Sequence, residues 1–210
     1  MYKRQYLNWA NEVYKPTYIT QHTLNLTGGS EVGRYLVSFD YLDQPGLVKN
    51  TEYQRYSYRV NTDLNIGKML KVSSDVTYRH VDRLWPESLG SVQYDVWSMQ
   101  PTSPVRYENG DYRLDKQNRN AISLMDLDVV GEDRYNMDVV YGQVKADFEP
   151  IKDLVFTGMA SLNGSWDRRK IHYKNYKYYN EAGELVTQRN NPNSVKAVSY
   201  THLRAHETAA

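Results

Sequence analysis

The fold is decided by the stretch RYSYRVNTDLNI, which occupies residues 55–66. Apolar and polar side chains alternate along it, and only Thr62 interrupts the alternation. The apolar face carries Tyr56, Tyr58, Val60, Leu64 and Ile66. The other face carries Arg55, Ser57, Arg59, Asn61, Asp63 and Asn65. Because successive side chains of a strand point to opposite faces, this stretch predicts a β-strand with one apolar and one charged face.

The neighbouring segments repeat this pattern and predict hairpins. Residues 70–79 alternate in the same way after a short connection at Gly67. An earlier pair of alternating segments turns at Gly28-Gly29-Ser30, and a later pair turns at residues 150–153. Glycine, proline and aspartate at such points favour tight turns. The pattern predicts about six strands. No stretch combines helical spacing with capping residues, so no helix is predicted.

Strand length and loop length favour a membrane barrel over a soluble sandwich. The alternating runs have about 11 to 15 residues, whereas globular strands usually have about 5 to 6 and membrane strands need about 9 to 11. Short turns follow Thr27, Ile66 and Glu149, while long connections lie between the hairpins. Short turns on one side and long loops on the other are typical of outer-membrane barrels. The predicted fold is all-β, a partial antiparallel transmembrane β-barrel.

In such a barrel the two faces of each strand meet different media. The residues predicted to face lipid are Tyr56, Tyr58, Val60, Leu70, Val72 and Val76. The residues predicted to face the lumen are Arg34, Arg55, Arg59, Lys71, Asp75 and Arg79. A soluble secreted carbohydrate-binding β-sandwich is the alternative, and a plain porin is a third possibility that the strand pattern leaves open.

The composition excludes several classes of protein. The 210 residues carry 26 Lys and Arg against 25 Asp and Glu, so the formal net charge of +1 gives no reason to expect a nucleic-acid partner. There is no cysteine, which excludes disulfides and thiolate metal sites. The mean hydropathy is −0.76, yet 20 tyrosines are present. Such an excess of tyrosine is typical of β-surfaces and of aromatic girdles at membrane interfaces.

Both ends of the chain resemble translated sequencing adapters. Residues 1–5, MYKRQ, match one transposase adapter read with GTG as the start codon, and residues 198–208 match the reverse complement of its partner. The expected organisation is therefore an adapter-like run at 1–5, a loop or linker at 6–19, barrel strands at 20–168 with a long extracellular loop at 82–135, an extracellular loop at 169–197, and an adapter-like run at 198–210. The remaining sequence is expected to be an internal fragment.

Three motifs in the first half of the chain carry a family resemblance. They are LNLTGGSE at 24–31, YLDQPGLVKNT at 41–51 and RVN at 59–61. Together they resemble the early barrel strands of SusC/RagA-type TonB-dependent outer-membrane transporters, and the match is specific over about residues 24–72. The resemblance implies import of oligosaccharides or peptides across the outer membrane of a Gram-negative bacterium. It also implies a SusD-like surface lipoprotein as partner, TonB acting through a region absent from this chain, and contact with outer-membrane lipid.

No residue pattern supports catalysis, a metal or a cofactor, so the protein is not expected to be an enzyme. His22, His80 and His172 lie in three separate segments without ligand spacing. The acidic residues Asp126, Asp128, Glu132 and Asp133 are interpreted as solvated loop charge rather than a calcium site.

Aromatic residues in the long connections are the best candidates for ligand binding. Flat rings stack on the C–H groups of sugars and on peptide side chains, while nearby polar groups take up hydrogen bonds. The candidate substrate-binding residues are Trp85, Trp97, Tyr107, Tyr112, Tyr176 and Tyr178. The alternative interpretation is that these rings form the outer aromatic girdle or pack the loops against one another.

Overall fold

The computed structural model describes residues 6–114, 117–180, 182–191 and 194–209. In this part of the chain, one antiparallel sheet has seven strands in the order β1-β2-β3-β4-β5-β6-β9. These strands span Thr20–Gly29 (β1), Gly33–Asp43 (β2), Glu52–Ile66 (β3), Leu70–Pro86 (β4), Gly131–Ile151 (β5), Leu154–Tyr173 (β6) and Val195–Ala209 (β9). The predicted antiparallel barrel-wall fold is confirmed, and the sheet stays open.

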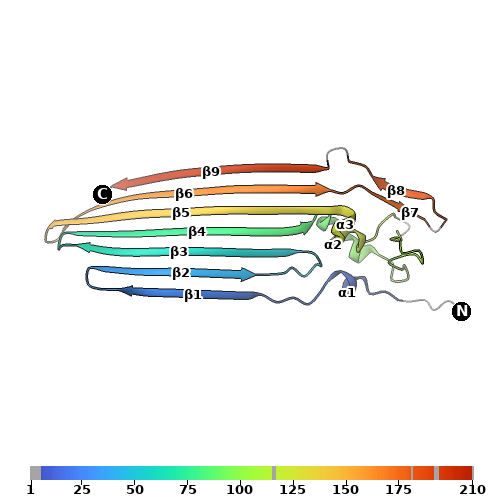
Figure 1. Cartoon of the computed structure of the whole chain (residues 1–210), viewed down its shortest axis with the longest axis horizontal. Helices are drawn as coiled ribbons and strands as arrows, with labels where there is room; N and C mark the ends of the chain where they lie inside the picture. Colours follow the sequence, from blue (N-terminus) through green and yellow to red (C-terminus); the bar gives the residue numbers. More distant parts are fainter. Residues whose placement is uncertain (1–5, 115–116, 181, 192–193, 210) are drawn as a thin grey trace.

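The connections separate by length, as the alternating pattern predicted. The tight turns β1–β2, β3–β4 and β5–β6 lie at one end of the sheet, and the helices lie at the other (Figure 1). Gly67 in the β3–β4 turn has φ of 66°, a left-handed conformation that glycine adopts without strain. The strands also extend beyond their predicted ends, because β4 and β5 pair up to Pro86↔Glu132.

The strand register sorts the side chains into two faces. Leu26, Val37, Val60 and Val76 are successive partners across β1 to β4, and Leu162 on β6 continues this row beyond Gly142. One position along, Asn61 pairs with Leu36 and Asp75, and Asp75 pairs with Gln143. Because the side-chain period is two, successive rows fall on alternate faces of the sheet. We call the face that carries Val60 the apolar face and the face that carries Asn61 the polar face.

Rows of rings and large apolar side chains mark both edges of the apolar face. The upper aromatic row consists of the rings of His22, Tyr41, Tyr56, His80 and Trp166, and Asp138 lies in the same register row between His80 and Trp166. Neighbouring rings within it lie 6.4 Å (His22–Tyr41), 5.0 Å (Tyr41–Tyr56) and 6.3 Å (Tyr56–His80) apart. The lower edge consists of Ile66, Leu70, Phe148 and Phe156.

The distance between these two edges fits a membrane barrel. Ile66 lies ten positions after Tyr56 on β3. Ten steps of about 3.3 Å, tilted by about 40°, span about 25 Å, which is the height of the apolar band of an outer-membrane barrel.

The long connections fold into a compact cap at one end of the sheet. It contains the helices α1 (Trp9–Val13), α2 (Leu89–Ser98), η1 (Ser123–Met125) and α3 (Leu127–Val130), and the hairpin of β7 (Tyr176–Tyr179) and β8 (Leu185–Arg189). Its core consists of Trp9, Val13, Val48, Val92, Val96, Met99, Ala121 and Met125. Among the described residues, none of the helices is long and apolar enough to cross a membrane.

The sequence-based expectation that the chain has no helix is wrong. Residues 89–98 form α2, although the N-cap residue before it, Ser88, makes no side-chain capping bond. Val92 and Val96 lie one helical turn apart and are buried in the cap core, with Met99 beside them. Packing of this stripe against α1 stabilises a helix that is too short to persist by propensity alone.

The adapter-like run at residues 198–208 forms most of β9, which pairs with β6. This pairing places Glu207 opposite Ala160, on the apolar face. A carboxylate within a lipid-facing band is unfavourable, so we propose that this run is not native sequence. The other run, residues 1–5, lies outside the described residues.

The parent gene amplified from its source DNA is expected to lack codons for both runs, and a continuous native frame containing them would contradict the proposal.

Candidate functional site

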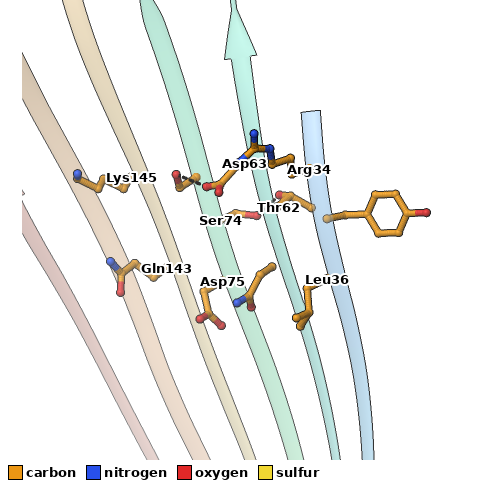
Figure 2. A pocket seen from close by; sticks show the side chains of 11 residues that line it. Arg34, Leu36, Thr62, Asp63, Ser74, Asp75, Gln143 and Lys145 are labelled. Carbon is orange, nitrogen blue, oxygen red and sulfur yellow. Dashed lines mark hydrogen bonds between the residues drawn. The ribbon is translucent and has the colours of Figure 1, made fainter. Parts of the chain in front are cut away.

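The polar face holds a trough of about 440 Å³ across β2 to β5. Figure 2 shows that Arg34, Asp63, Asp75, Gln143 and Lys145 line it from four different strands. Several of these side chains have polar or charged partners along the sheet. Ser73 donates a hydrogen bond of 2.6 Å to Asp63, and Lys145 donates one of 2.8 Å to Asp147. The trough is therefore an open polar surface across the four strands.

All six residues predicted to face the lumen lie on the polar face. By register, Arg34 pairs with Asp63, Lys71 with Asn65 and Arg79 with Ser57. Arg55 donates a hydrogen bond of 3.0 Å to Asp40 of the neighbouring strand. Arg59 likewise forms an ion pair with Asp75. The six residues predicted to face lipid lie together on the apolar face. The sheet thus groups each set on one side, and the medium that each side meets is part of the proposal below.

A second cavity, of about 350 Å³, lies in the cap between the β4–β5 connection and β7. Three of the six predicted aromatic residues, Tyr112, Tyr176 and Tyr178, line it. The other lining residues include Arg106, Asp111, Asp126, Asp128, Asn175 and Lys177. The cavity thus combines tyrosine rings with charges of both signs and one amide. We call it the cap pocket.

Two tyrosines of the cap pocket are held by hydrogen bonds from their hydroxyl groups. Tyr112 donates one of 2.7 Å to Asp126, and Tyr178 donates one of 2.8 Å to Ser123. Tyr178 is only 6% exposed, and burial raises its pKa to about 12. The pKa of Tyr112 is also raised, mainly by burial and secondly by its hydrogen bond to Asp126. Both hydroxyls therefore stay protonated at neutral pH, and the rings form a fixed wall.

A contact between tilted rings, a cation–π contact and an ion pair hold the rest of the cap pocket. The Tyr176 and Tyr178 rings lie 4.9 Å apart, and the Arg106 guanidinium lies 3.6 Å from the centre of the Tyr112 ring. Lys174 forms an ion pair of 2.8 Å with Asp128, and this bond lowers the pKa of the Asp128 carboxyl group. Such a preformed wall requires little ordering when a ligand binds.

The other three predicted aromatic residues do not line the cap pocket. Trp85 lies at the end of β4, where the Arg83 guanidinium stacks 3.8 Å from its ring centre. Trp97 lies on α2 and is 78% exposed. Tyr107 lies 5.5 Å from the Arg113 guanidinium. Sequence reasoning missed Arg106. The signal that could have found it is Asn109-Gly110, a dipeptide typical of tight turns, because the turn there pairs Arg106 with Tyr112.

Two curated proteins of Formosa agariphila resemble part of the chain, while no family model matches it. TonB-dependent receptor P26 is 30% identical over 106 residues, which are 50% of this chain and 10% of that protein. TonB-dependent receptor P3 is 33% identical over 69 residues, which are 33% of this chain and 7% of that protein. The chain thus spans about a tenth or less of the length of these relatives.

Solved structures of the RagAB system share the fold. The RagAB peptide transporter aligns with a TM-score of 0.69 over 84% of this chain and 21% of that chain, at 20% identity. The RagAB peptide importer in its closed-closed state aligns with a TM-score of 0.68 over 83% of this chain and 20% of that chain, also at 20% identity.

The fold and the sequence relatives together support a fragment of a TonB-dependent receptor barrel. Within that class, the resemblance to the SusC/RagA-type transporters is confirmed. The relatives are named as receptors and the structural neighbours as a transporter or importer. TonB-dependent receptors are outer-membrane proteins of Gram-negative bacteria.

Proposed function

We propose that this chain forms part of the wall of an outer-membrane importer for oligosaccharides or peptides. In this proposal the apolar face meets lipid, the polar face lines the lumen, and the cap lies outside the cell. The observation that carries it is the uncovered apolar band of about 25 Å, bounded by the upper aromatic row and by Phe148 and Phe156. The resemblance adds a SusD-like surface lipoprotein and TonB as partners.

The cap pocket is the proposed point of contact with the imported molecule. Its tyrosine rings offer stacking surfaces, while Asp111, Asn175 and Lys177 offer hydrogen bonds beside them. Oligosaccharides and peptides both match this combination of rings and polar groups.

Cysteine labelling of the full-length parent in native membranes tests the proposed orientation. Tyr58→Cys and Val60→Cys are expected to react with a lipid-soluble maleimide and not with a membrane-impermeant one, since both lie on the apolar face. Asn61→Cys is the matched control, because it lies next to Val60 but on the polar face, and the impermeant reagent is expected to reach it. Labelling of Tyr58→Cys and Val60→Cys by the impermeant reagent would contradict the proposal.

A further inference from the structure

Three basic side chains lie together on the outward side of β5 and β6, just beyond the upper aromatic row. Arg134 and Lys170 are direct register partners, and Arg168 pairs with Asn136 two positions along. They share the face of Trp166, since Trp166, Arg168 and Lys170 alternate along β6. All three side chains are exposed, and that of Arg168 is 62% exposed. We call this group the basic cluster.

Direct opposition of two cations is unusual and destabilising in an antiparallel pair. Partners in register have their Cβ atoms about 5 Å apart, and like charges there repel each other. The nearby carboxylates compensate this repulsion unevenly. Asp138 pairs with Arg168 at 2.9 Å, and Glu132 lies 3.9 Å from Arg134, which also lines a small pocket with Glu52 and Asp82. Among the described residues, Lys170 has no carboxylate within ion-pair distance. An added anion between Arg134 and Lys170 would relieve the repulsion.

The height of the basic cluster matches the headgroup layer of a membrane. Lys170 lies four positions beyond Trp166 on β6, and Arg168 lies two positions beyond it. At about 3.3 Å a step and a tilt of about 40°, these positions are about 10 Å and about 5 Å above the aromatic row. The headgroup layer extends about 5 to 8 Å beyond the hydrocarbon on each side, and long basic side chains reach along it.

The surface below the cluster is smooth enough to accept acyl chains. On the same face, β5 and β6 carry Gly142, Ala146, Gly158 and Ala160, which form a shallow strip between larger side chains. No neighbouring atom lies within 4 Å of a Cβ built on Gly142 or Gly158. An extended hydrocarbon chain can therefore lie along the strip beneath Trp166.

We propose that Arg134, Arg168 and Lys170 bind the phosphate of an acylated, phosphorylated glycolipid in the leaflet on the cap side. Phosphate oxygens accept charge-assisted hydrogen bonds from guanidinium and ammonium groups, and the acyl chains then lie over the strip below. This inference rests on the proposed orientation of the apolar face toward lipid.

Native mass spectrometry of the full-length parent in detergent, titrated with bis-phosphorylated lipid A, tests the inference. The double variant Arg134→Gln/Lys170→Gln is expected to weaken lipid A binding at least tenfold, or about 1.4 kcal/mol. Lys170→Arg is expected to retain binding, because it keeps the charge. Lys152→Gln is the matched control, since Lys152 lies in the β5–β6 turn at the opposite end of the sheet. It is expected to bind like the parent.

Two further arms identify the ligand and separate the two proposals. Dephosphorylated lipid A is expected to bind poorly, and excess inorganic phosphate is expected not to displace bound lipid A. Three outcomes would overturn the inference. They are binding of lipid A by the double variant as tight as by the parent, binding of dephosphorylated lipid A as tight as of lipid A, and displacement of bound lipid A by inorganic phosphate. If one of these outcomes occurs while Val60→Cys still reacts only with the lipid-soluble maleimide, the proposed membrane orientation stands and only the lipid site is wrong. If the membrane-impermeant maleimide labels Val60→Cys, both the proposed membrane orientation and the lipid site are wrong.

Discussion

Expressed alone in water, residues 6–197 are expected to form inclusion bodies rather than a soluble monomer. The exposed area of the structure is 14388 Å², whereas a globular protein of 24.6 kDa exposes roughly 10,000 Å². The excess reflects a sheet that buries neither face. Its unpaired edges and its apolar face favour association between chains. Size-exclusion chromatography of the soluble fraction checks this result, and refolding into detergent is the matched condition in which recovery is expected.

The contrary outcome would favour a different class of protein. A monodisperse soluble species with cooperative unfolding is expected of a soluble carbohydrate-binding β-sandwich, in which a second sheet covers the apolar face. In the described part of the chain, the buried apolar cluster lies in the cap, and no second sheet covers the first. The structure therefore favours the barrel wall.

Val60→Arg in the full-length parent is expected to destabilise the folded barrel by about 2 to 4 kcal/mol and to impair its assembly. Val60 lies near the middle of the apolar band, is 40% exposed and pairs with Val37 and Val76. An arginine at the mid-plane of a lipid-facing strand loses its hydration, which accounts for the cost. Heat-modifiable migration on gels measures the folded fraction in outer membranes, and urea titration measures the free energy of unfolding.

Asn61→Arg is the control for this variant. Asn61 is the next residue along β3, lines the trough of the polar face and accepts a hydrogen bond of 3.0 Å from Arg59. Near-normal assembly is expected, because the new guanidinium would remain hydrated and would lie opposite Asp75. Equal damage from both substitutions would show that β3 is buried on both faces, which a barrel wall does not allow.

The cap pocket was only partly predictable, because its residues come from distant segments. Tyr112 and Tyr176 are 64 positions apart in the sequence, and no local pattern links them. The Asn109-Gly110 turn predicts only the short-range pair of Arg106 with Tyr112. The contact of Tyr178 with Ser123 depends on how the β7–β8 hairpin docks onto the cap. Arg189 of β8 fixes that docking through Glu87, at 2.6 Å, and through the carbonyl of Val130.

The sequence by itself determined strands β1 to β6, their faces and the end of the sheet at which the long loops gather. These features follow from alternation and turn residues, which act between near neighbours: Tyr58 and Val60 share a face because a strand has a period of two. Only the tertiary structure decided the cap. α2 exists because Val92 and Val96 are buried among residues that the chain brings from afar, such as Trp9 and Val48. Long-range burial stabilises such elements, and a local pattern does not encode it.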